Sequence, residues 1–163
     1  MKRLVCLAAL LTFVAFPAWA GDAHGKGDMD AMMAEMAKCN VCKNMMPAMQ
    51  ELGPVLGGEV VKLSNGMAVI HTVSDPEKVA LLQEIGEKMG MACAAATKMT
   101  DTEAKDGLCS ICSEVRVALL AGAEMGGGAT KNGDMFVLTS NDPKVQAKIA
   151  KVEQKFQMTM AMH

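Results

Sequence analysis

The chain has 163 residues, with 16 basic and 18 acidic side chains and a formal net charge of -2. This length suits one compact domain or two small fused units, and the absence of a basic stripe argues against nucleic acid as a partner. The chain holds 17 methionines but only 4 phenylalanines, 1 tryptophan and no tyrosine. The residues that usually stack on bases or sugars are therefore scarce.

The first 20 residues are typical of a secretory signal peptide. Lys2 and Arg3 precede an apolar run over 4–16, and small residues lead up to an expected cleavage site after Ala20. The apolar run is too short to cross a bilayer core of about 30 Å. We therefore expect a periplasmic or secreted protein with no membrane span.

The cysteines divide into one in the signal peptide and five in the mature chain. Cys6 lies inside the predicted signal peptide. The remaining cysteines are Cys39, Cys42, Cys93, Cys109 and Cys112. In an oxidising compartment, an odd number of cysteines leaves one thiol unpaired or used for another purpose.

Two stretches of the mature chain resemble each other at a fixed spacing. SNGMAVIHTVSDPEKV at 64–79 matches KNGDMFVLTSNDPKV at 131–145 when the first is shifted by 67 residues. Because such an internal match is typical of a duplicated unit, we predict a tandem duplication. The predicted order is a signal peptide at 1–20, an N-terminal tail and Met-rich lead-in at 21–37, a first repeat at 38–99, a linker at 100–107 and a second repeat at 108–163.

The first repeat is predicted to contain a helix, two strands and a second helix. The first helix covers about 39–52, and a Gly-rich connector follows it. Strands at 59–64 and 67–73 are joined by Asn-Gly, a strong hairpin signal because both residues tolerate a positive φ. Asp75, followed by proline, is a good N-cap for a helix that ends near Ala96.

The second repeat is predicted to have the same order of elements. A helix covers about 109–124, a strand at 135–139 is clear and its partner near 129–131 is weak. A helix that begins at Asp142 has an apolar side chain every three or four residues. Since one hairpin alone is marginally stable, we predict an α+β fold with one four-stranded antiparallel sheet and helices packed on one face.

Each repeat carries one CxxC motif, Cys39 with Cys42 and Cys109 with Cys112. Residues three apart share a helix face, so both thiols of a pair can point the same way. If a two-fold axis relates the repeats, the four thiols can converge near it, and four thiolates suit zinc or copper(I). The leading hypothesis is an exported, soluble metal-binding protein that holds one such ion through these cysteines.

Two other uses of the cysteines stay open. Disulfides within or across the pairs would make the chain a stapled structural or interaction module without catalysis. A CxxC at a helix start also suits a thiol-disulfide oxidoreductase, although no βαβ pattern precedes either pair. The chain has no Ser-His-Asp set, no H-E-x-x-H helix and no phosphate loop, so no enzyme other than a redox enzyme is expected. The sequence names no protein partner.

Weaker candidates for metal ligands are Cys93, Met160 and His163. Cys93 aligns with Met160 at the offset of 67. An exchange of Cys for Met fits either a buried apolar position or a soft metal site. His163 can offer an imidazole, but nothing in the sequence fixes its position near the chain end.

The methionines and one further histidine have more ordinary interpretations. Sulfur-containing residues recur every three or four positions, as on one helix face: Met29, Met32, Met36, Cys39, Cys42, Met46 and Met49. We predict that this stripe packs in the core, with soft thioether ligation as the alternative. His71 lies in a predicted strand, and we expect it to be a packed or surface residue and not a ligand.

Overall fold

The computed structural model describes residues 25–160. The predicted signal peptide with Cys6, the tail up to His24, and His163 all lie outside the described residues. The elements in chain order are α1 (Gly25–Lys38), α2 (Met46–Leu52), β1 (Leu56–Leu63), β2 (Gly66–Val73), η1 (Pro76–Lys78), α3 (Val79–Ala96), α4 (Asp101–Gly107), α5 (Ser110–Leu120), β3 (Glu124–Thr130), β4 (Gly133–Thr139) and α6 (Pro143–Met160). Within this part of the chain, no helix combines the length and the apolarity needed to cross a membrane.

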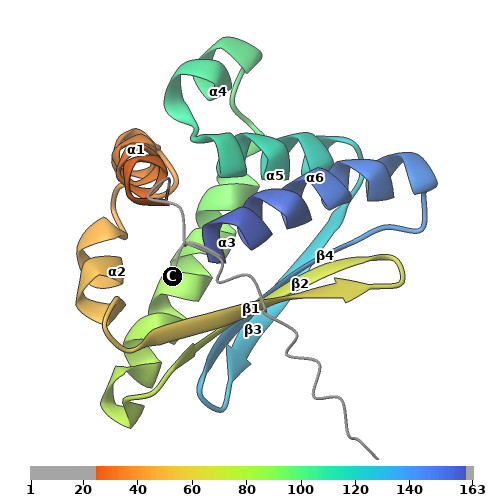
Figure 1. The fold of residues 1–163 in the computed structure, drawn as a ribbon. Helices are drawn as coiled ribbons and strands as arrows, with labels where there is room; N and C mark the ends of the chain where they lie inside the picture. Colours follow the sequence, from red (N-terminus) through yellow and green to blue (C-terminus); the bar gives the residue numbers. More distant parts are fainter. Residues whose placement is uncertain (1–24, 161–163) are drawn as a thin grey trace, which may run out of the picture.

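The strands form one antiparallel sheet in the order β1-β2-β4-β3. The two hairpins therefore meet through β2 and β4 at the centre, and β1 and β3 form the edges. The helices gather on one side of this sheet (Figure 1). The predicted α+β fold with a four-stranded antiparallel sheet is confirmed.

The two hairpins keep the same register at an offset of 67. In the central pair of strands, Val69 lies opposite Phe136, and these two residues are themselves 67 positions apart. A two-fold axis that relates the hairpins therefore passes between Val69 and Phe136. This geometry agrees with the duplication hypothesis, which stays a prediction about how the chain arose.

Each hairpin is covered by the helix that follows the other hairpin. α3 lies mainly over β4 and β3, and the Gln83 side chain donates a hydrogen bond to the Thr130 carbonyl at 2.9 Å. α6 lies over β1 and β2, with Met160 packed against Gly58. The most deeply buried side chains come from both halves: Leu52, Met67, Val69, Leu82, Leu138, Ile149 and Val152. The two halves thus share one core.

The second helix of each half begins as its sequence predicts. The Asp75 carboxylate accepts a hydrogen bond from the Glu77 backbone N–H, and the Asp142 carboxylate accepts one from that of Lys144. The first of these helices starts with the short 3-10 turn η1 before α3. Both carboxylates satisfy N–H groups that have no partner within a helix.

Three boundaries differ from the predictions. Residues 40–45 form turns, and the helix α2 begins only at Met46. Pro47 favours this start because it lacks an N–H and fits the first helical turn. α5 ends at Leu120, and the glycine-rich segment that follows is a full edge strand, β3. The predicted lead-in and linker also contain helices, α1 and α4, the latter with a capping box between Thr100 and Glu103.

The hairpin turns lie one residue earlier than predicted. The two-residue loops are 64–65 and 131–132, and no described residue other than glycine has a positive φ. Gly66 and Gly133 are instead the first residues of the central strands. A Cβ atom at either position would lie 2.0 Å from a carbonyl oxygen of the neighbouring central strand. Glycine is required there by close approach, and not by the turn.

This contact predicts that Gly66→Ala destabilises the protein by about 1–3 kcal/mol, since β2 and β4 would have to move apart. Gly90→Ala in α3 is the matched control, because its Cβ would meet nothing within 4 Å. The control should raise the free energy of unfolding by about 0.5–1 kcal/mol. Urea unfolding of both variants measures the difference, and equal effects would contradict the close-approach argument.

Candidate metal centre

The structure brings the two CxxC motifs together. Cys39 and Cys42 lie in the loop between α1 and α2, Cys109 is the N-cap of α5, and Cys112 lies in the first turn of that helix. Their Sγ atoms all lie within 4.8 Å of one another. The predicted convergence of the pairs is confirmed, and the four cysteines could hold a metal ion.

The spacing of the sulfurs is close to that of a tetrahedral metal site. Cys42 Sγ lies 3.5 Å from Cys112 Sγ and 3.9 Å from Cys109 Sγ. With metal–sulfur bonds of about 2.3 Å, a tetrahedral zinc ion separates its ligands by about 3.8 Å. Small adjustments of the side chains would therefore be enough to coordinate an ion.

No disulfide is present among the described cysteines, since all five thiols are free. The 3.5 Å between the Sγ atoms of Cys42 and Cys112 far exceeds a disulfide bond length of about 2.05 Å. The alternative of a disulfide-stapled module therefore finds no disulfide among the described cysteines. Reduced thiols are the form in which cysteine, as thiolate, binds a metal.

The thiols modify one another's ionisation. A hydrogen bond with the Cys109 thiol is the main cause that lowers the pKa of Cys39, and a bond with Cys112 is the main cause that lowers the pKa of Cys109. The pKa values of Cys42 and Cys112 are raised, chiefly by their hydrogen bonds to Cys109. The four thiols therefore share hydrogen bonds and do not ionise independently of one another.

Burial explains why a cation would stabilise this cluster. The four cysteines are between 1% and 5% exposed. Thiolates that are removed from water need a compensating charge. A bound cation would supply that charge and displace the remaining protons.

Hydrogen bonds from outside the cluster hold the two cysteine loops in place. The Asn40 backbone N–H donates to the Gly107 carbonyl at 2.7 Å and so ties the first motif to the segment before the second. Cys109 makes no side-chain capping bond at the start of α5. The Glu35 carboxylate of α1 accepts from the Ser110 backbone N–H at 2.6 Å instead, and from its hydroxyl at 3.2 Å.

A buried arginine anchors the other side of α5. Arg116 donates to the carbonyls of Ala96 and Met99 at the end of α3, at 3.1 and 2.7 Å. It also donates to the Asp101 carboxylate at 3.1 Å. The sequence analysis missed Arg116 and Glu35. The only available signal was that Arg116 is a charged residue next to the apolar face of α5.

The weaker ligand candidates lie outside the four-thiol cluster. Cys93 is buried on α3, and burial, followed by the charges of Cys39 and Cys109, raises its pKa to about 11. Met160 lies against Gly58 of β1. His163 is outside the described residues.

The methionine stripe is largely used for packing. Met46 is buried, and Met36 and Met49 are partly buried against the core. Met32 accepts a hydrogen bond from the Thr159 hydroxyl at 3.4 Å, which links α1 to the end of α6.

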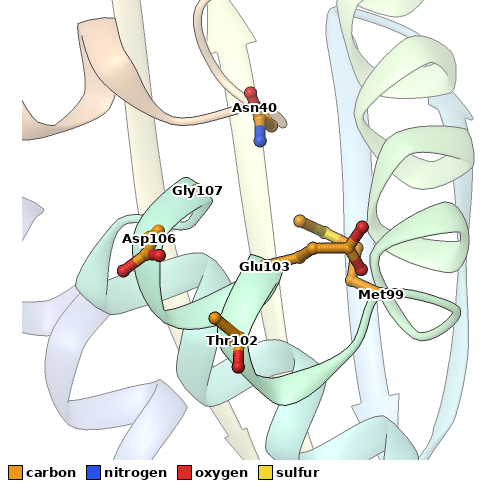
Figure 2. A pocket seen from close by; sticks show the side chains of 6 residues that line it. All are labelled: Asn40, Met99, Thr102, Glu103, Asp106 and Gly107. Carbon is orange, nitrogen blue, oxygen red and sulfur yellow. The ribbon is translucent and has the colours of Figure 1, made fainter.

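A shallow pocket of about 410 Å³ borders both cysteine loops (Figure 2). Asn40 lies between the first two cysteines, and Gly107 lies two residues before the third. The lining residues are Asn40, Met99, Thr102, Glu103, Asp106 and Gly107. The pocket is therefore acidic, with one thioether at its wall.

The fold and the site were compared with known proteins. No family model, no curated protein and no solved structure matches the chain. The chemistry of the site therefore has to be argued from its own geometry.

We predict that Glu35→Ala weakens the site, because α5 loses the acceptor at its N-terminus. The loss of a helix cap lowers the free energy of unfolding by about 1 kcal/mol, and the loss of a partner outside the ligands lowers metal affinity roughly 10–100-fold. Competition with a zinc chelator measures the affinity. Glu87→Ala, at an exposed position on α3, is the control and should keep the affinity of the natural chain. Equal affinities for both variants would contradict this role of Glu35.

Cys93 is predicted to react slowly in the native protein. With a pKa of about 11, its thiolate fraction at pH 8 is only about one in a thousand. The rate of alkylation at Cys93, mapped by mass spectrometry, should rise about tenfold for each pH unit between 8 and 10. Rapid labelling of Cys93 at pH 8 in folded protein would show that this thiol is not buried.

Proposed function

We propose that this chain is an exported protein that binds one soft or borderline metal ion, Zn²⁺ or Cu(I), through Cys39, Cys42, Cys109 and Cys112. One observation carries the proposal: two cysteine pairs 70 positions apart place four buried Sγ atoms within 4.8 Å of one another. Export rests on the signal-peptide pattern of residues 1–20 and is part of the proposal.

Burial favours metal binding over thiol-disulfide exchange. An oxidoreductase needs a thiolate that its substrate disulfide can reach. The most exposed member of the cluster, Cys112, is only 5% exposed. A stapled structural module would require sulfurs at bonding distance, and the described thiols are free.

The ligand set indicates what the bound ion would do. Four protein thiolates complete a tetrahedral shell and leave no open position for a substrate or water, unlike a catalytic zinc site. Thiolates also suit Cu(I). We therefore propose that the chain stores, delivers or is stabilised by the ion. The acidic pocket beside Asn40 and Gly107 supports an approach of cations from that side.

Elemental analysis and thiol titration on one sample of the exported protein test this proposal. We expect one metal ion per chain and four thiols that react only after a chelator is added. Cys93→Ser should keep the metal, and Cys42→Ser should lose it or bind it far more weakly. A sample with no metal and only one free thiol in denaturant would contain two disulfides, and the metal proposal would then be withdrawn.

A further inference from the structure

A second set of metal-ligating groups lies on the helix-covered face of the sheet, and it includes none of the four clustered cysteines. We propose that His71 Nε2 of β2 and Met160 Sδ of α6 bind a single Cu(I) or Ag(I) ion. The proposal does not depend on the four-thiol site. It rests on the orientation of the imidazole, on the space provided around it and on the position of the thioether.

Asp134 orients the imidazole of His71. The His71 Nδ1 atom lies 3.2 Å from Asp134 Oδ1, and Asp134 is buried, at 7% exposure. A carboxylate that accepts a hydrogen bond from Nδ1 leaves the lone pair of Nε2 free to bind a metal. Metal-binding histidines commonly have such a partner on their other nitrogen.

The surrounding chain makes room for this polar pair. A Cβ atom at Gly86 of α3 would lie 2.0 Å from Asp134 Oδ2, so only glycine at position 86 leaves space for the carboxylate.

The other half of the sheet has an apolar pair at the equivalent place. At the offset of 67, Met67 and Leu138 replace Asp134 and His71, and both are fully buried. Burial of a polar pair is less favourable than burial of an apolar pair. Stability alone therefore does not explain why this half carries His71 and Asp134.

The thioether of Met160 lies beside Gly58, the residue of β1 that faces His71. Gly58 pairs with His71 in the sheet, and a Cβ atom on Gly58 would lie 3.3 Å from Met160 Sδ. Cβ atoms of directly opposed residues are about 4.5–5.5 Å apart, so Met160 Sδ lies within about 9 Å of the His71 Cβ atom, a distance that the imidazole and one bound ion can span. The His71 side chain is 25% exposed, so an ion can reach it from solvent.

The chemistry of these two ligands selects the metal. Thioether sulfur is a soft ligand that suits Cu(I), and imidazole is also a good copper ligand. Zinc instead prefers four ligands, drawn from thiolate, imidazole and carboxylate groups. The site would therefore take a monovalent soft ion in preference to zinc.

Titration of the reduced full chain with Ag(I) tests this site by calorimetry and by NMR of ¹³C-methyl-labelled methionine. After the thiols are saturated, we expect one further Ag(I) to shift the Met160 methyl signal. Met160→Leu, a substitution that nearly conserves volume, should bind one equivalent fewer. Met158→Leu is the matched control, because Met158 lies on the same helix and is 57% exposed. An unshifted Met160 signal, or equal binding by the two variants, would overturn the proposal.

A second variant separates this site from the four-thiol site. The double substitution His71→Leu with Asp134→Met copies the apolar pair of the other half and should fold. It should lose the additional Ag(I) and keep one zinc per chain. Retention of the additional Ag(I) would overturn the proposal, whatever the zinc count. If the double variant does not fold, the Ag(I) titration of Met160→Leu tests the proposal by itself.

Discussion

The antiparallel pairing of β2 with β4 is the contact on which the rest of the structure depends. It joins two hairpins into one sheet and sets the two-fold relation between them, with Val69 opposite Phe136. Residues related by a two-fold axis can meet only near that axis. The two cysteine pairs, one from each half, also meet, with their Sγ atoms within 4.8 Å of one another. Gly66 and Gly133 allow this pairing because neither has a side chain to separate the strands.

The thiol cluster combines two requirements that oppose each other. Burial holds four sulfurs close together, but it disfavours the thiolate form that a metal needs. Hydrogen bonds between the thiols offset part of this cost, since they lower the pKa values of Cys39 and Cys109. The N-terminus of α5 adds a favourable dipole next to Cys109. A bound cation would replace the remaining thiol protons and balance the negative charge of the thiolates.

Local sequence patterns predicted the elements that local interactions determine. The aspartate caps, the apolar strand β2 and the apolar stripe of α6 follow from backbone and side-chain preferences. The edge strand β3 was underestimated, because its three consecutive glycines have little strand preference and pair only where β4 presents a partner.

The environment of the candidate site could be predicted only in part. The repeated CxxC spacing identified the four cysteines, and the repeat suggested that they converge. The contacts of Glu35 with Ser110 and of Arg116 with the end of α3 join segments far apart in the chain, so no local pattern marks them. The pairing of His71 with Asp134 likewise depends on which strand lies next to β2.

Each of the helices α3 and α6 covers the hairpin of the other half, and this has a consequence for how such a molecule could be assembled. A chain with only one half would have a hairpin whose covering helix is missing. It would also have only two of the four clustered thiols. Two such halves, on separate chains, would satisfy both needs by forming a symmetric dimer, with the ion shared between subunits. In the present chain α4 joins the halves covalently. Folding and ion binding then no longer depend on protein concentration, as they would for two separate subunits.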